Sequence, residues 1–396
     1  MGLFAGGRLA LERQEILERV TQAGLRGRGG GWFPVGRKWR AVLAEGGRPL
    51  VVANGAEGEP GSVKDRFLMT QRPDDVLAGL GLAAQAVGAS EAIVYLKGSF
   101  EAPAAALAGA LARRSLPGLQ VRIVRGPDSY IAGEETALLE DLEGRRAWPR
   151  PKPPLPAAVG FQGRPTLVQN VETLARVPAA VADPAAFRAT EHTCVSVWGH
   201  VRQPGVREVR LGTPLGRIVA DLAGGAAEGI RMVFPAGPSG APLTAEQLET
   251  PLDPDALRQG GSALGTAALL VLRASTCPLS IAASLAGFFE RESCGQCPPC
   301  TQGTLNLARV VRAVEGGTAR AKDLRDLAEA AGFMSLHGYC AHSRTAAGSI
   351  TGLLARFRQD VEDHLRAGGC PRPEGRCDPF AEGSPERSAI EASLPR

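Results

Sequence analysis

Hydrophobic residues recur with two different periods in the first half of the chain, and segments of the two kinds alternate. Apolar residues at helical spacing mark residues 9–23, 74–87 and 102–114. Short apolar runs typical of buried strands occupy residues 49–54, 92–96 and 119–124. Helices that alternate with strands predict βαβ units around a parallel sheet, whose ligands bind at the carboxyl ends of the strands.

The pattern changes near residue 193. Two alternating segments around Gln203-Pro204-Gly205 predict a hairpin, and residues 267–272 form a further expected strand. From residue 281 the spacing is helical again, and after Gly368 the chain is rich in proline, glycine and charge, which predicts disorder. We therefore expect an α/β domain at residues 1–190, a strand-rich domain at 191–277, a helical domain at 278–368 and a disordered tail at 369–396.

The composition is that of a globular protein. Of the 396 residues, 44% are hydrophobic and 22% are charged, and the net charge of +4 is spread over segments of mixed sign. No run of Lys and Arg of the kind that binds nucleic acid stands out. Residues 1–20 lack the apolar core of a secretory leader, and the most apolar stretch is broken by Arg273 and Pro278, so we expect no membrane insertion. Eight cysteines, half of them in one pattern, suit a reducing cytoplasm.

Cysteines carry the most specific chemical signal in the sequence. Cys294, Cys297 and Cys300 form two C-x-x-C steps that share the middle cysteine. Three thiolates from one short loop suit a cubic iron–sulfur cluster, which needs a fourth ligand from elsewhere, and Cys340 is the natural candidate. A structural zinc site is the main rival, although zinc sites usually pair two separate C-x-x-C steps.

The other four cysteines receive simpler interpretations. Cys194 and Cys277 lie in apolar surroundings and are interpreted as core residues. Cys370 and Cys377 lie seven residues apart in the expected tail, and a metal role for them is the less favoured alternative.

Three glycine-rich loops are candidates for ligand binding. In the first, residues 27–39, glycines would let backbone N–H groups approach a phosphate, with Arg28 and Lys38 as countercharge; a plain flexible loop is the alternative. The second, residues 54–66, follows a buried strand, and its Glu57 and Glu59 could accept hydrogen bonds from sugar hydroxyls.

The remaining charges of these loops have less specific interpretations. Residues 64–66 (Lys-Asp-Arg) are interpreted as a salt-bridge cluster on the surface. In the third loop, residues 126–138, Gly133 opens a helix whose first turn carries Glu134 and Glu135, which the helix dipole stabilises. A well-capped helix start would explain that segment equally well by itself.

Taken together, these segments resemble the NADH-oxidising flavin subunit of respiratory complex I and its relatives in formate dehydrogenases and bidirectional hydrogenases, over residues 24–365. The resemblance implies an α/β fold with a Rossmann-like FMN-binding domain, a β-grasp (soluble-ligand-binding) insert and a C-terminal helical bundle that carries a [4Fe–4S] cluster. It implies oxidation of NADH through FMN, with single electrons leaving through the cluster to partner iron–sulfur, ferredoxin-like subunits of a larger redox or quinone-reducing complex. Such a subunit is cytoplasmic and peripheral to a membrane complex.

The resemblance also assigns site residues. It places around FMN residues Gly27, Arg28, Gly29, Gly30, Lys38, Asn54, Glu57, Tyr130, Gly133, Glu134, Asn170 and Thr173. It places Phe33, Glu59 and Glu135 at the dinucleotide, with the two glutamates as catalytic candidates. It assigns the cluster to Cys294, Cys297, Cys300 and Cys340.

The sequence departs from the family pattern at several positions. Ala56 stands where the family has aspartate, Gln169 where it has asparagine, and Trp32 where it has glycine. Ala41 and Leu155 replace two aromatic residues expected around the adenine. The changes at Ala56, Trp32, Ala41 and Leu155 motivate an alternative, an FMN/[4Fe–4S] electron-transfer or scaffold subunit that has lost NADH oxidation. A zinc-stabilised β-grasp binding protein is a third hypothesis.

Overall fold

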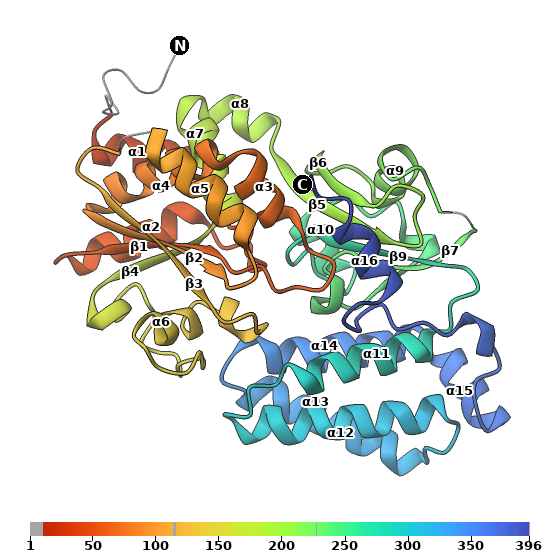
Figure 1. The fold of residues 1–396 in the computed structure, drawn as a ribbon. Coiled ribbons are helices and arrows are strands. Elements are labelled where there is room, and N and C mark those ends of the chain that lie inside the picture. Colours follow the sequence, from red (N-terminus) through yellow and green to blue (C-terminus); the bar gives the residue numbers. More distant parts are fainter. Residues whose placement is uncertain (1–10, 114–115, 227, 396) are drawn as a thin grey trace. The chain divides into compact units, whose positions relative to one another are not determined.

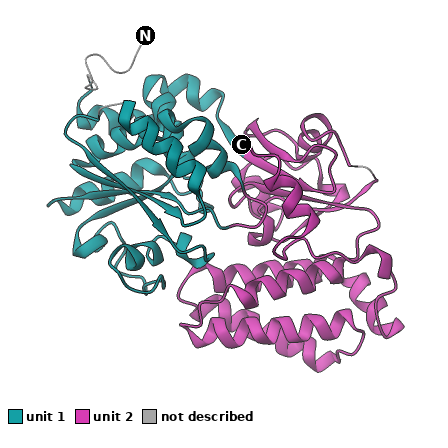
Figure 2. Cartoon of the chain, in the orientation of Figure 1, with its two compact units in different colours: residues 1–58, 63–194, 395–396 teal, residues 59–62, 195–394 magenta. Residues whose placement is uncertain are grey.

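The computed structural model describes residues 11–113, 116–226 and 228–395. The chain forms two compact units, shown in Figure 2. Unit 1 comprises residues 11–58, 63–194 and 395, and unit 2 comprises residues 59–62 and 195–394. The finer division of unit 2 at residues 277/278 stays a prediction.

Unit 1 alternates helices and strands, as Figure 1 shows. Its elements are α1 (Arg13–Ala23), α2 (Val35–Glu45), β1 (Leu50–Gly55), α3 (Lys64–Gln71), α4 (Pro73–Val87), β2 (Glu91–Lys97), α5 (Glu101–Arg113), β3 (Gln120–Gly126), η1 (Ile131–Gly133), α6 (Ala137–Leu142), η2 (Phe161–Gly163), β4 (Thr166–Asn170), α7 (Val171–Ala182) and α8 (Pro184–Ala189). The six helices and strands expected before residue 125 are all present, and residues 9, 10 and 114 of the expected helices lie outside the described residues.

The four strands of unit 1 form one parallel sheet in the order β3-β2-β1-β4. Successive side chains of a strand point to opposite faces, and β1 follows this rule. Val51 and Ala53 pack into one apolar core with α1, α4 and α7, whereas Leu50 and Val52 pack into a second core with α6. A sheet covered on both faces leaves its carboxyl edge as the place for a ligand. The predicted Rossmann-like architecture is confirmed.

Unit 2 combines a mixed sheet with a helical bundle. Its elements are β5 (His192–Gly199), β6 (Gly205–Arg210), α9 (Leu215–Arg217), η3 (Ile218–Leu222), β7 (Ile230–Phe234), η4 (Gly237–Ser239), β8 (Leu243–Thr244), η5 (Ala245–Gln247), α10 (Pro254–Gln259), β9 (Ala268–Arg273), α11 (Pro278–Arg291), α12 (Pro298–Glu315), α13 (Ala321–His337), α14 (Ala341–Arg356), α15 (Arg358–Ala367), η6 (Pro373–Gly375) and α16 (Pro385–Glu391). The strand order is β6-β5-β9-β7-β8, with β5 parallel and β7 antiparallel to β9.

The segment after Gly368 is ordered, so the expectation of a disordered tail at 369–396 is wrong for the residues described there. Phe380 is fully buried, with its ring edge-on to Trp198 at 6.1 Å and to Phe234 at 6.0 Å between centroids. Ile390 of α16 is also fully buried. The few apolar side chains of this polar segment therefore complete the core of unit 2, which composition alone does not reveal. In the described residues, none of the helices is both long enough and apolar enough to cross a membrane.

Candidate cofactor sites

Two asparagines mark the carboxyl edge of the sheet in unit 1. Asn54 of β1 and Asn170 of β4 are register partners in the parallel pair. The Asn54 side chain donates to Gly133 O at 2.8 Å and accepts from Ala56 N at 3.1 Å. The Asn170 side chain caps α7 by accepting from the backbone N–H groups of Glu172 and Thr173. The two amides therefore fasten the second and third glycine loops and the start of α7 to one edge.

The first glycine loop lies against the start of α7. The backbone N–H of Arg28 donates to Thr173 Oγ1 at 2.7 Å, and a Cβ on Gly29 would approach Asn170 Cβ to 3.2 Å. Gly27 N donates to Phe33 O at 2.9 Å and closes the loop, in which Gly30 has φ 103°, a conformation that favours glycine. A Cβ on Gly31 would meet no atom within 4 Å. The loop thus presents backbone with open space beside it, which fits an approaching phosphate.

The Arg28 side chain points into the protein. It is 1% exposed, pairs with Glu191 Oε1 at 2.5 Å and lies over the Trp32 ring at 4.2 Å. Its charge is therefore already paired with a carboxylate, in contrast to its expected role as countercharge for a phosphate. Trp32 has φ 49°, which explains why glycine suits this position, and its ring is buried against Arg28.

The third glycine loop touches the second. A Cβ on Gly133 would lie 2.7 Å from Ala56 O, so this contact requires glycine. Tyr130, half-buried, accepts from Gly133 N through its carbonyl at 3.2 Å. One oxygen of Glu134 accepts from Thr136 N at 2.8 Å and Ala137 N at 3.0 Å, so this carboxylate caps α6.

Glu135 lies between two lysines. Its carboxylate pairs with Lys38 Nζ at 2.9 Å and with Lys152 Nζ at 2.8 Å, while Lys152 also reaches Glu134 at 2.7 Å. Burial by itself would raise the pKa of Glu135, but the two ammonium groups lower that pKa to about 2. The Glu135 side chain keeps 28% of its surface exposed, and Phe33 of the first loop is 49% exposed. A fixed anion and a half-exposed aromatic ring, with Arg37 over it at 5.2 Å from the ring centroid, are therefore available to a polar, ring-containing ligand.

The two glutamates of the second loop differ in their surroundings. Glu57 accepts from the backbone N–H groups of Asp65 and Arg66 at 3.0 and 3.2 Å, so it caps α3. Glu59 belongs to unit 2, where Ser239 Oγ donates to its Oε1. The two catalytic candidates, Glu59 and Glu135, thus come from different units.

A buried ion network behind the second loop was missed from the sequence. Lys64, which is 1% exposed, pairs with Asp65 Oδ1 at 2.6 Å and Glu172 Oε2 at 3.1 Å. Asp65 also accepts from the Asn170 side chain at 2.7 Å. The interpretation of residues 64–66 as a surface cluster is therefore wrong for Lys64 and Asp65. The glycine-rich loop before these residues was the one sequence signal for their burial, since it marks a ligand loop with packed structure behind it. Charged residues in such a place are buried only when they are paired.

The cluster candidates lie in unit 2 at helix starts. Cys297 and Cys340 are the N-cap residues of α12 and α14, Cys300 lies in the first turn of α12, and Cys294 lies in the preceding loop. Burial, together with the charges of Cys297, Cys340 and Cys294, raises the pKa of Cys300 to about 12. Cys340 is therefore within electrostatic reach of the triplet. The positive ends of two helix dipoles favour anionic ligands here.

The four cluster candidates do not form a tight group of the kind that one zinc ion needs. In the part of the chain that the structure describes, no three of these four sulfur atoms lie within 4.8 Å of one another. Thiolates on one tetrahedral zinc ion would lie about 3.8 Å apart. In a multi-iron cluster each iron takes its own cysteine, so the cysteine sulfurs lie farther apart than they do on one zinc ion.

Two protein-family models match the chain, one almost wholly within unit 1 and the other within unit 2. Residues 20–179 match the Nuo51 FMN-binding domain family, and residues 280–364 match the NADH-ubiquinone oxidoreductase-F iron-sulfur binding region. The chain is 37% identical over 379 residues to an NADH-quinone oxidoreductase F subunit of Rhizobium meliloti, covering 90% of both chains. It is 37% identical over 385 residues to the NADH-quinone oxidoreductase F subunit of Streptomyces coelicolor, covering 92% of this chain and 86% of that one.

Solved structures show the same similarity. An NAD+-reducing [NiFe]-hydrogenase in the H2-reduced state matches with a TM-score of 0.83 and 36% identity over 91% of this chain and 64% of that chain. Its air-oxidized state matches with a TM-score of 0.84 and 36% identity, over 96% and 66%. The chain thus spans slightly less than two thirds of the matched hydrogenase chains.

Proposed function

Because the chain belongs to the family of NADH-quinone oxidoreductase F subunits, we propose that it oxidises NADH through FMN and passes single electrons through a [4Fe–4S] cluster to a partner iron–sulfur subunit. When bound, FMN converts hydride chemistry into single-electron chemistry, while the protein supplies binding and electrostatics. The observation that carries the proposal is the convergence of the three glycine loops on the carboxyl edge marked by Asn54 and Asn170.

The residues of this edge have distinct roles in the proposal. The backbone of residues 27–31 receives the flavin phosphate, because open space adjoins Gly31 and because the helix start behind it favours anions. Asn54, Asn170, Thr173 and Gly133 act by holding the loops in place, since their polar atoms or close contacts join one loop to another. Glu57 and Glu134 hold α3 and α6 in position.

The dinucleotide side of the proposal rests on Phe33 and Glu135, both of unit 1. The exposed ring of Phe33 offers a stacking surface, and the Glu135 carboxylate, held ionised by Lys38 and Lys152, offers an acceptor for hydroxyl or amide hydrogens. Trp32 does not favour the alternative of lost NADH oxidation, because its ring is buried on Arg28 instead of covering the open side of the loop.

Electrons leave through Cys294, Cys297, Cys300 and Cys340 in this proposal. Beside Cys340, Leu336 is 80% exposed and Tyr339 is 45% exposed. Exposed apolar side chains next to a redox centre fit the docking of a partner subunit. We therefore assign the surface formed by Leu336 and Tyr339 to the electron-accepting subunit, through which the chain is attached peripherally to a larger complex.

The test is anaerobic reduction of the purified chain loaded with FMN and cluster. Addition of NADH should bleach the flavin absorbance and then give the electron paramagnetic resonance signal of a reduced cluster. In the matched variant Cys300→Ser the flavin should still bleach, and the cluster signal should be lost. A protein that holds flavin but leaves it oxidised with both NADH and NADPH would refute the proposal, as would stoichiometric zinc without labile sulfide at these cysteines.

A further inference from the structure

Unit 2 contains a second group of metal-type side chains, away from the cluster cysteines. Cys277 Sγ lies 3.3 Å from His364 Nε2 and 3.5 Å from Cys370 Sγ, and the three ligand atoms all lie within 4.8 Å of one another. Cys277 is the N-cap of α11, His364 lies in the last turn of α15, and Cys370 begins the C-terminal segment. Three separate parts of the chain therefore bring soft or borderline ligands to one point.

The histidine is oriented as a ligand. His364 is 1% exposed, and its Nδ1 lies 2.7 Å from Asp360 O. A carbonyl can only accept, so the hydrogen resides on Nδ1 and the lone pair of Nε2 faces Cys277. A hydrogen bond from the distal nitrogen to a carbonyl is the usual outer support of a metal-binding histidine. Arg231 and Arg372 bind the Asp360 carboxylate at 2.7 and 2.8 Å and hold that turn of α15 in place.

A second group of possible metal ligands contains a histidine that is not oriented as a ligand. His200, Cys377 and Glu386 also lie within 4.8 Å of one another. His200 Nδ1, however, accepts from Arg273 N at 3.2 Å, so its hydrogen lies on Nε2, which faces Glu386 Oε1 at 3.4 Å. Both ring nitrogens of His200 are thus engaged without a metal, and the Cys377 sulfur, which lies with this second group, would have to turn toward the first group to bind there.

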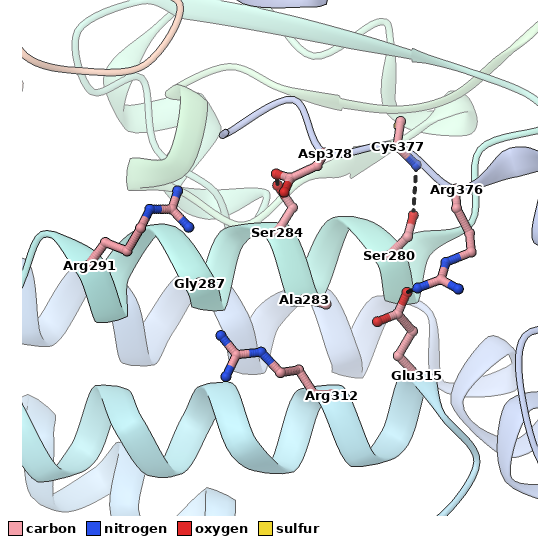
Figure 3. Close-up of a pocket in the computed structure, with 10 residues that line it drawn as sticks. All are labelled: Ser280, Ala283, Ser284, Gly287, Arg291, Arg312, Glu315, Arg376, Cys377 and Asp378. Atoms are coloured by element: carbon pink, nitrogen blue, oxygen red, sulfur yellow. Dashed lines mark hydrogen bonds and ion pairs between the residues drawn. The ribbon is translucent and has the colours of Figure 1, made fainter. Parts of the chain in front are cut away.

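Cys377 is held close to the first group by its backbone. Cys277 N donates to Gly375 O at 2.9 Å, and Cys377 N donates to Ser280 Oγ at 3.4 Å, a contact drawn in Figure 3. The segment that carries Cys377 is therefore tied on both sides to the first turn of α11. The thiols of Cys277 and Cys377 also influence each other electrostatically.

We propose that Cys277, His364 and Cys370 bind a zinc ion and that Cys377 supplies the fourth ligand. Three thiolates and one imidazole form a standard tetrahedral zinc set, and ligand atoms on such an ion lie about 3.5–3.8 Å apart, close to the 3.3 and 3.5 Å that separate Cys277 Sγ from His364 and Cys370. A chain of hydrogen bonds, from the Cys370 thiol to Cys277 and from the Cys277 thiol to Nε2 of His364, would give these contacts without a metal, and the zinc measurements below distinguish the two arrangements. The prediction that Cys277 is a core residue is confirmed by its full burial, and the proposal adds a metal-binding role to it.

The site would be structural and would lie apart from electron transfer. α11 begins at the proposed zinc and ends before Cys294, and its 14 residues span about 21 Å at 1.5 Å per residue. Zinc has no redox chemistry, and a site with four protein ligands has no open position for substrate. Its role would be to fasten the C-terminal segment, with the buried Phe380, to α11 and α15.

The test measures zinc and iron per chain in the full-length protein. The wild type should hold one zinc besides its cluster iron. Cys370→Ser and Cys377→Ser should lose at least tenfold in zinc affinity and keep their iron, whereas Cys300→Ser should lose iron and keep zinc. This reciprocal pattern separates failure of the zinc site from failure of the proposed redox function. Cys370 and Cys377 are only half-buried, so serine at either position should leave the fold intact.

Two further measurements apply to the wild type. Cobalt(II) in place of zinc should give an intense thiolate-to-cobalt charge-transfer band, weakened in Cys377→Ser. Bound zinc should protect Cys277 and Cys370 from alkylation. Absence of zinc from protein purified with added zinc, or a Cys277–Cys370 disulfide in protein kept reduced, would overturn the proposal. Unchanged zinc affinity and an unchanged cobalt spectrum in Cys377→Ser would overturn the assignment of the fourth ligand.

Discussion

Replacing Lys64 with methionine should strongly destabilise unit 1. Lys64 is 1% exposed and is the ammonium shared by Asp65 and Glu172, at 2.6 and 3.1 Å. Methionine keeps the apolar length of the side chain but leaves two buried carboxylates without this cation. Breaking a buried ion pair costs about 3–5 kcal/mol. The lower part of that range applies, because Asn170 still donates to Asp65, and Thr193 Oγ1 and Cys194 N still donate to Glu172.

A matched control lies in the same unit. Arg72 Nε pairs with Asp75 Oδ2 at the same 2.6 Å, but the side chains are 41% and 42% exposed. Arg72→Met should therefore cost less than about 1 kcal/mol. Urea unfolding followed by tryptophan fluorescence compares the two variants, because three of the four tryptophans (32, 39 and 148) lie in unit 1.

The pH dependence gives an independent check. Burial by itself would lower the pKa of Lys64, but the carboxylates of Asp65 and Glu172 raise that pKa above its usual value, so this ammonium is charged in the wild type throughout the neutral range. Without it, protonation of the buried carboxylates relieves the unpaired charge, and the deficit of Lys64→Met should shrink as the pH falls. Equal costs for Lys64→Met and Arg72→Met, or a deficit that grows at acidic pH, would refute the reasoning.

Three further outcomes are expected. Because the pKa of Glu135 is lowered to about 2 in the folded protein, its ionised form contributes up to about 3 kcal/mol to the free energy of unfolding above its ordinary pKa, and this is lost as the pH falls through the folded value. The stability of Glu135→Gln should therefore fall less steeply with acid than that of the wild type, and parallel curves of unfolding free energy against pH would contradict this. Phe380→Ala should cost about 3–5 kcal/mol because the ring is fully buried, whereas the matched change at Phe333, 55% exposed, should cost under about 0.5 kcal/mol; calorimetry of both variants decides. Iron content should fall as far in Cys340→Ser as in Cys297→Ser, and full iron in the former would remove Cys340 from the ligand set.

The local hydrophobic pattern predicted the strands of unit 1 correctly, but it did not predict which charged side chains of that unit are buried. The apolar run at 49–54 became β1 at Leu50–Gly55, because buried parallel strands are continuous apolar segments with few alternatives. The burial of Lys64 was not predictable in that way. It depends on Glu172, more than 100 residues away, which β4 and α7 bring to the second loop.

In the C-terminal segment, too, contacts with distant residues determine the structure, here by ordering a segment whose composition predicts disorder. Its proline, glycine and charge content is typical of disorder, yet Phe380 fills a site lined by Trp198, Phe234 and Phe288 from distant parts of the chain. One aromatic side chain in a polar segment does not change its average composition. For the cluster, by contrast, the short spacing of Cys294, Cys297 and Cys300 already implied a shared site and the sequence offered Cys340 as the fourth ligand, which the fold brings within electrostatic reach of Cys300.

Cys297 and Cys340 occupy N-cap positions of α12 and α14 without making a side-chain cap hydrogen bond. Serine at an N-cap usually stabilises a helix by about 1 kcal/mol over a residue that cannot cap. The metal-free chain should therefore hold these two helices more firmly with serine than with cysteine at both positions. Redox chemistry and helix stability thus favour different residues at the same two positions, and a variant library screened for folding alone would enrich the substitutions that abolish the cluster.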